Sequence, residues 1–109
     1  MALNMTLYQN KINAYKMNEI MSATADELVF ILFDQAILGC KSQNQKKASD
    51  AVGELISSLN FEYEISNGLF RLYDYSLRKI KQQQYNDVLP LLTELRDTWK
   101  EALHSLQAA

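Results

Sequence analysis

The sequence predicts an all-α protein, an antiparallel four-helix bundle preceded by an N-terminal arm or short helix. Its 109 residues include only three glycines and one proline, so few positions interrupt a helix. Apolar residues recur at helical spacing in four segments, and no strand hairpin signal appears. Four amphipathic helices joined by short links pack best as an antiparallel bundle. No internal repeat is apparent at the periods typical of solenoid proteins.

The arm of this prediction is residues 1–21, and the bundle is residues 22–109. The arm is rich in Asn and Met, and Tyr8, Ile12 and Tyr15 share one helical face. A helix this short and without caps would be marginal on its own. We therefore expect an arm rather than a further bundle helix.

The first bundle helix is expected from Thr24 to about Ser42. Thr24 and Glu27 have the spacing of a capping box, in which each side chain accepts a hydrogen bond from a backbone N–H. One apolar stripe comprises Leu28, Ile31, Leu32 and Leu38. A second comprises Val29, Phe33, Ala36, Ile37 and Cys40. Two stripes predict burial on more than one side.

The second helix is expected from about Lys47 to Asn60. Its apolar face comprises Ala48, Val52, Leu55 and Leu59. Gly53 weakens it by about 1 kcal/mol relative to alanine. At 1.5 Å per residue it is about 20 Å long, against about 30 Å for the two helices that follow. The mismatch predicts apolar surface that the bundle does not cover.

The third helix is expected from about Glu62 to Gln83. One stripe comprises Ile65, Leu69 and Leu72, and the other Phe70, Tyr73, Leu77 and Ile80. As in the first helix, one stripe can face the core while the other is covered by the arm. Alternatively, the arm is displaceable and an amphipathic partner helix enters the same groove. Both interpretations remain open at this point.

The fourth helix is expected from about Asp87 to Gln107. Pro90 should lie in its first turn, where a missing N–H costs little. Trp99, the only tryptophan, stands in a charged run but belongs to an apolar stripe with Leu92, Leu95, Leu103 and Leu106. This spacing predicts that its ring anchors the helix in the core.

Catalytic chemistry has little support, and the sequence predicts neither an enzyme nor a metal or cofactor site. His104, the single histidine, has no nucleophile and no third ligand at a useful spacing. No cysteine or histidine pairs indicate zinc, and no glycine-rich loop could hold a phosphate. Cys40 lies among apolar neighbours and is expected to be a buried thiol.

The net charge of −2 and the scattered Lys and Arg residues argue against nucleic acid as a partner. The longest apolar run, residues 28–33, is too short to cross a bilayer, and no signal peptide is evident. We therefore expect a cytoplasmic protein without membrane insertion.

The sequence resembles the FliS family, the flagellin-specific export chaperones of bacterial flagella. Its landmarks span about Ile12 to Ala102. In order they are Ala14-Tyr15, Ser22 to Leu28, Leu32 to Ala36, Glu54 to Asn60, Leu72-Tyr73-Asp74-Tyr75 with Arg78, and Leu95 to Ala102. Three departures stand out: Ala25 where the family commonly has proline, Gln35 where it has glycine, and a span from Asp34 to Glu54 shorter by roughly three helical turns.

The resemblance implies a chaperone that binds the disordered C-terminal region of flagellin, prevents premature polymerisation and delivers flagellin to the export gate. It implies an arm that lies over the flagellin groove and takes part in gate docking, with Ile12 and Tyr15 as contacts. The expected groove residues are Leu32, Phe33, Ile56, Leu69, Leu72 and Tyr73.

A second hypothesis is a non-catalytic bundle whose extra stripes serve self-assembly or another protein contact. The short first hairpin also raises the possibility of a dimer in the absence of flagellin, including one in which helices one and two are exchanged.

Overall fold

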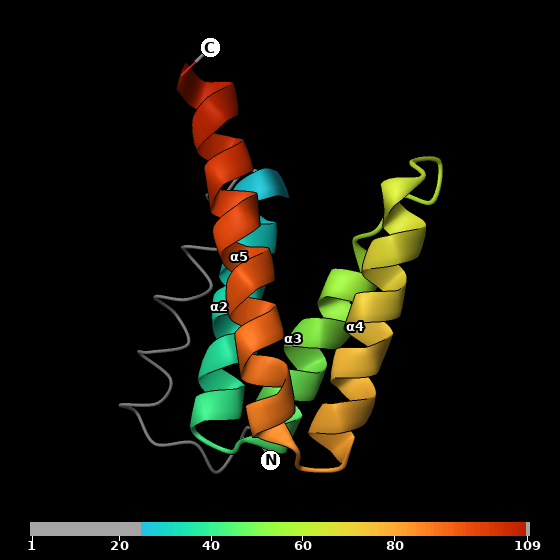
Figure 1. The fold of residues 1–109 in the computed structure, drawn as a ribbon, viewed down its shortest axis with the longest axis vertical. Helices are drawn as coiled ribbons and strands as arrows, with labels where there is room; N and C mark the ends of the chain where they lie inside the picture. Colours follow the sequence, from blue (N-terminus) through green and yellow to red (C-terminus); the bar gives the residue numbers. More distant parts are fainter. Residues whose placement is uncertain (1–24, 109) are drawn as a thin grey trace, which may run out of the picture.

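The chain folds into four α-helices, as the computed structural model shows for residues 25–108, with side chains described for residues 26–102 (Figure 1). The helices are α2 (Ala25–Lys41), α3 (Gln45–Ser57), α4 (Ile65–Lys81) and α5 (Tyr85–Ala108). They run antiparallel, and the main contacts join α2 to α3 and α5, and α4 to α3 and α5. The prediction of an all-α four-helix protein is confirmed.

The predicted arm lies outside the described residues, and so does Thr24 of the expected capping box. The α2 helix otherwise ends within one residue of its expected position. The α3 helix begins two residues earlier than expected, because Asn44 caps it: its side chain accepts a hydrogen bond from the backbone N–H of Lys47 at 3.1 Å. It also ends earlier, at Ser57. The α4 helix begins later, at Ile65, because a turn precedes it.

The expectation for Pro90 is wrong. The α5 helix begins at Tyr85, two residues earlier than expected, which places Pro90 in the second turn rather than the first. A proline there cannot donate to the carbonyl four residues back, that of Asn86. Pro90 is exposed, so that carbonyl does not have to be satisfied within the core.

The core lies where all four helices meet. Its largest members that are almost fully enclosed are Phe33 from α2, Val52 and Leu55 from α3, Ile80 from α4, and Val88 and Leu92 from α5. The second of the two predicted α2 stripes faces this core, whereas Leu38 of the first is exposed. Cys40 is buried as expected, and burial raises the pKa of its thiol to about 11, so the thiol stays protonated and unreactive at neutral pH.

The bundle consists of two helical hairpins built on one pattern, a repeat that the sequence reading did not find. Gln43 ends α2 with φ 55°, and Gln83, 40 residues later, ends α4 with φ 59°. In each turn the residue after this glutamine donates its backbone N–H to a carbonyl five residues back, Asn44 to Gly39 at 2.8 Å and Gln84 to Lys79 at 2.9 Å. This is the helix-ending Schellman arrangement. Side-chain identity is not shared between the halves, and this hides the repeat.

The two hairpins differ in how closely their helices approach. A Cβ atom at Gly39 would lie 2.6 Å from the backbone nitrogen of Ala48, so α2 and α3 meet backbone to backbone. The positions equivalent to these two residues are Lys79 and Val88, whose side chains require more room. The α4–α5 seam is accordingly the least extensive of the four, and α4 diverges from α5 away from the turn (Figure 1).

Candidate functional site

An apolar cavity of about 530 Å³ opens at the end of the bundle where α4 and α5 diverge. We call it the open-end cavity. It lies between the first half of α2, the α3–α4 connection, the first half of α4, and Trp99 of α5. Its aliphatic lining comprises Leu28, Val29, Leu32, Leu59, Ile65 and Leu69. Its size and apolar lining are those of a binding site for a large apolar group.

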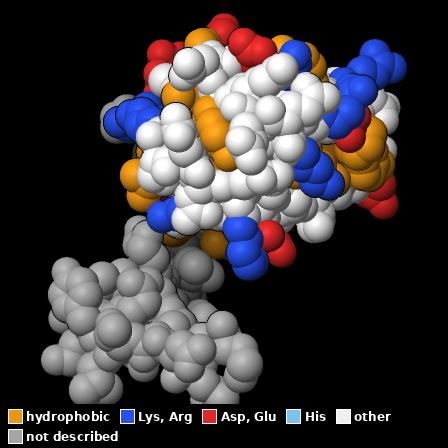
Figure 2. Space-filling view, turned by 90° about the horizontal axis from the view of Figure 1, so that it is seen from below, with side chains coloured by type: hydrophobic (Ala, Val, Ile, Leu, Met, Phe, Trp, Pro, Cys, Tyr) orange, Lys and Arg blue, Asp and Glu red, His pale blue; other side chains and the backbone are white. Residues whose placement is uncertain are grey.

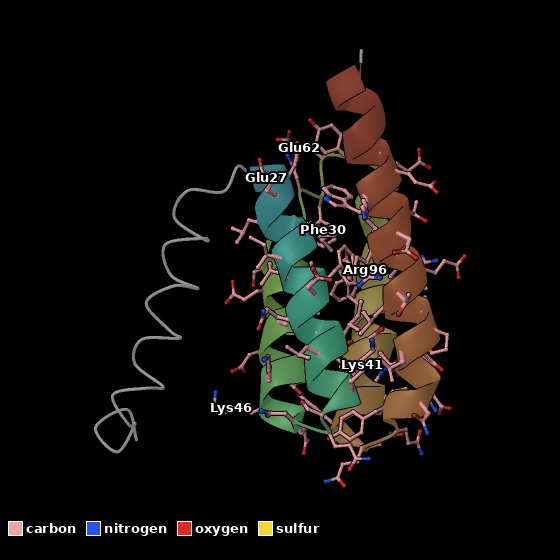
Figure 3. The ribbon with its side chains drawn as sticks, turned by 90° about the vertical axis from the view of Figure 1, so that its left-hand side faces the viewer. Glu27, Phe30, Lys41, Lys46, Glu62 and Arg96 are labelled. Carbon is pink, nitrogen blue, oxygen red and sulfur yellow. The ribbon has the colours of Figure 1, made fainter. Side chains whose placement is uncertain are left out.

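Two contacts hold α5 against α2 and so build one wall of the cavity. The indole Nε1–H of Trp99 donates to the backbone carbonyl of Asp26 at 3.0 Å. One turn earlier, the Arg96 guanidinium reaches across to the Asp34 carboxylate at 3.0 Å (Figure 3). The hydrogen bond to Asp34 raises the pKa of Arg96 further above its ordinary value. Trp99 thus anchors α5 as predicted and also lines the cavity.

The α3–α4 connection, residues 58–64, forms the opposite wall. The hydroxyl of Ser66, itself buried, donates to the carbonyl of Asn60 at 2.6 Å. The Asn60 side chain accepts from the backbone N–H of Glu62 at 3.0 Å. These bonds give a segment without regular helix a defined shape, so its side chains are presented in fixed positions.

Large apolar side chains remain exposed on this connection and at the start of α4. Tyr63 is 64% exposed and Ile65 is 71% exposed, and both line the cavity. Phe61 and Phe70 are exposed beside them, with ring centroids 6.0 Å apart in an edge-on arrangement. A cluster of this kind on a polar surface is typical of a contact site for another protein.

Tyr73 links the cavity to the core. It lines the cavity and is nevertheless buried, and its ring centroid lies 6.0 Å from that of Phe33. Burial raises the pKa of the Tyr73 hydroxyl to about 12. The phenol is therefore neutral at physiological pH, and the cavity contains no charge at this point.

The structure brings three of the expected groove residues together, because Leu32, Leu69 and Tyr73 all line the open-end cavity. Phe33 lies in the core at 2% exposure and does not line the cavity. Ile56 packs half-buried against the core, and Leu72 is 37% exposed on α4; neither lines the cavity. The expected arm contacts, Ile12 and Tyr15, lie outside the described residues.

The sequence reading did not assign the α3–α4 connection to the site. The signal was present: Phe61 and Tyr63 alternate with acidic residues in a segment that follows the natural end of α3. Large aromatic side chains in a connection rather than on a helix face indicate a surface that another element covers. The sequence places Leu28, Val29 and Ile65 on apolar stripes of two different helices. Only the arrangement of the helices shows that these stripes meet in one cavity.

Within the described part of the chain, no group of three or more His, Cys, Asp or Glu side chains is arranged to hold a metal ion. No helix among the same residues is long and apolar enough to cross a membrane. His104 falls outside the residues whose side chains are described.

Comparison with known proteins gives two matches of the same kind. Residues 8–106 match the family described as flagellar protein FliS. The flagellar secretion chaperone FliS of Bacillus subtilis (strain 168) is 30% identical over 118 residues, which cover 89% of this chain and 89% of the relative. That alignment is longer than the 109 residues of this chain, so the relative has positions that this chain lacks. No solved structure gives a significant match. The chain belongs to the FliS family of flagellar proteins.

Proposed function

We propose that the protein is a cytoplasmic, non-catalytic flagellar secretion chaperone that binds the disordered C-terminal region of flagellin. Binding would prevent premature polymerisation and keep flagellin available for delivery to the export gate. Family membership and a relative that is itself a secretion chaperone support this proposal. The single observation that carries the binding step is the open-end cavity, an apolar space bordered by exposed aromatic side chains.

The physical basis is burial of apolar surface. A partner helix laid against the cavity would contact Leu32 and Leu69 on its walls and Tyr73 below them. Apolar burial contributes about 25 cal/mol for each Å² removed from water. Folding of a disordered partner would offset several kcal/mol of that gain. Affinity should therefore depend on a few well-placed side chains rather than on the whole surface.

Ile65 offers a clean test because it lines the cavity yet is largely exposed, so its substitution should leave the fold intact. We expect Ile65→Gln to weaken binding of a flagellin C-terminal peptide about tenfold in isothermal titration. Leu38→Gln is the matched control: it removes a 46% exposed aliphatic residue of α2 that does not line the cavity.

Circular dichroism should show a gain in helix when the peptide and the wild-type protein are mixed. No heat of binding and no gain in helix would contradict the proposed function. Equal loss of affinity in Ile65→Gln and Leu38→Gln would place the contact elsewhere on the molecule.

Delivery to the export gate is the second step of the proposal, with Ile12 and Tyr15 as the expected contacts. An Ile12→Ala, Tyr15→Ala double variant should still bind the flagellin peptide but should retain less of the export-gate protein in a pull-down. Retention equal to that of the wild type would remove these two residues from the proposal.

Self-assembly is the rival function, and the exposed pair Phe61 and Phe70 is the observation that favours it. Sedimentation separates the two hypotheses. A monomer that becomes a 1:1 complex on addition of flagellin supports the chaperone. A tight dimer, exchanged or not, that persists after this addition supports self-assembly.

A further inference from the structure

The two ends of the bundle carry opposite charge. Six of the eleven Lys and Arg residues lie in residues 41–47 and 78–81, at the end formed by the two tight turns. Lys41 and Lys46 mark this end in Figure 3, and Figure 2 looks onto it, with Lys and Arg side chains around its rim. Glu27 and Glu62 mark the opposite end, where the open-end cavity lies (Figure 3).

The acidic groups of the cavity end stand on two different walls. Asp26 belongs to the lining on the α2 side. Glu62 and Glu64 stand on the α3–α4 connection, on either side of Tyr63, and both are exposed. None of the described Lys or Arg side chains lines this cavity. The cavity is therefore lined mostly by apolar side chains, with Asp26 in its lining on one wall and Glu62 and Glu64 next to the lining residue Tyr63 on the other.

We propose that the open-end cavity takes one large apolar side chain of a partner helix that carries lysine or arginine on either side of that residue. The inference rests on the proposed function, since the partner helix would belong to flagellin, and it adds the chemistry that the site selects. The apolar residue would enter between Leu32 and Leu69, and the basic residues would lie near Asp26 on one side and Glu62 and Glu64 on the other.

Each part of this site contributes differently to recognition. Burial of the apolar residue supplies most of the affinity because its surface is removed from water. Exposed ion pairs at the rim add little individually, but they raise the rate of encounter and reject helices of the wrong charge. A partner with acidic flanks would meet like charge on both walls, so charge is the expected basis of selectivity.

Trp99 is a built-in reporter, because it is the only tryptophan of the chain and it lines the cavity. Its emission should be followed while the full chain is titrated with two synthetic amphipathic peptides of about 18 residues, long enough to form a helix. The peptides share one apolar face and differ only in having Lys or Glu beside a central Leu. We expect the Lys peptide to bind roughly tenfold more tightly at low salt and to lose this advantage as salt is raised.

Glu62→Lys with Glu64→Lys should weaken binding of the Lys peptide about threefold to tenfold and strengthen that of the Glu peptide. The matched control is Asp50→Lys with Glu54→Lys, which changes net charge equally on an exposed part of α3 away from the cavity. This control should leave the preference between the peptides unchanged.

Equal affinity for the two peptides, or no response of Trp99 to either, would overturn the inference. The inference would also fail if Trp99 responded to peptide only in the variant Lys11→Glu with Lys16→Glu. The chain's own N-terminal segment, held by its two lysines, would then be the occupant. Trp99 emission that depends on protein concentration without any peptide would identify a second copy as the occupant and would also overturn it. A separate titration with the flagellin C-terminal region distinguishes the two proposals. If the protein binds that region but shows no preference between the Lys and Glu peptides, the proposed function stands and the inference about charge falls.

Discussion

The α2–α3 hairpin and the α4–α5 hairpin have turns of the same geometry, but their helices pack together to different extents. Gln43 and Gln83 adopt the same left-handed conformation, and the same pattern of backbone hydrogen bonds closes each turn. Beyond the turn, Gly39 lets α3 approach the backbone of α2, whereas Lys79 stands at the equivalent place on α4. The first pair stays close together. The second pair diverges away from its turn, and the cavity lies at that open end, lined by the first half of α2 as well as by α4.

The glycine at position 39 permits a close approach of two helix backbones that the lysine at position 79 does not. The long side chain of Lys79 occupies this space: its ammonium donates to the Gln84 side chain at 3.0 Å and lies 3.6 Å from the carboxylate of Asp87 on α5. These exposed contacts stabilise the turn by little. The α4–α5 pair therefore depends on its buried residues near the turn, whereas the α2–α3 pair is packed closely over more of its length.

The largest expected effect comes from the equivalent core positions Ile80 and Cys40. Ile80→Ala should reduce the free energy of unfolding by about 2–5 kcal/mol, because it leaves a cavity in the α4–α5 hairpin, whose helices have the less extensive contact. Cys40→Ala removes less volume and should cost about 1 kcal/mol. Urea denaturation measures both. Equal losses would contradict this order, because the smaller deletion at Cys40 would then cost as much as the larger one at Ile80.

Gly39 and Gly53 give the next largest contrast. Gly39→Ala should cost about 1–3 kcal/mol, since its Cβ would collide with the backbone of Ala48. Gly53→Ala meets nothing within 4 Å and should instead stabilise the protein by about 0.5–1 kcal/mol. Thermal unfolding of the two variants checks this. Stabilisation by both substitutions would contradict the close approach of α2 and α3.

The helix starts after the two turns differ by a smaller amount. Asn44 caps α3 through its side chain, so Asn44→Ala should cost about 1 kcal/mol. The side chain of Gln84, its equivalent before α5, is exposed and accepts a hydrogen bond from the half-buried Lys79, so Gln84→Ala should change stability by less than about 0.5 kcal/mol. Chemical denaturation of both variants gives the difference, and a larger loss for Gln84→Ala would reverse the comparison.

The smallest effect near neutral pH comes from the raised pKa values. Burial raises the pKa of the Cys40 thiol from 9.0 to about 11 and the pKa of the Tyr73 hydroxyl from 10.0 to about 12. A folded pKa above the unfolded one adds stability that is complete below the unfolded value and is lost as pH rises toward the folded value. Stability should therefore fall from about pH 9 upward. Cys40→Ala should flatten the decline that begins near pH 9, and Tyr73→Phe the decline that begins near pH 10; an unchanged slope in both would contradict burial of these groups.

Much of the fold followed from periodicity, because amphipathic stripes report which faces are buried. The four helices, the burial of Cys40 and the anchoring of Trp99 were all predictable on that basis. Pro90 was misplaced because the start of α5 depends on a turn geometry set by Gln83, which has no strong sequence signature. Helix boundaries depend on caps and turns and are less clearly encoded than helix faces.

The site was less predictable than the fold. Of the expected groove residues, Leu32, Leu69 and Tyr73 line the open-end cavity, whereas Phe33 lies in the core. Their part in binding flagellin stays a prediction. The sequence shows stripes but not the angle at which helices diverge. The close approach of α2 and α3 at Gly39 and the divergence of α4 from α5 are both set by tertiary packing.

We expect the partner to bind at the open end of the bundle, between the first half of α2, the α3–α4 connection and α4, and not at the turn end. Amide hydrogen exchange with and without the flagellin C-terminal region tests it most directly. Binding at the open end should concentrate the added protection in the first half of α2, in residues 58–69 and around Trp99. Protection confined to the turn end, around Gln43 and Gln83, would contradict it, as would a complex that protects no amide of α4.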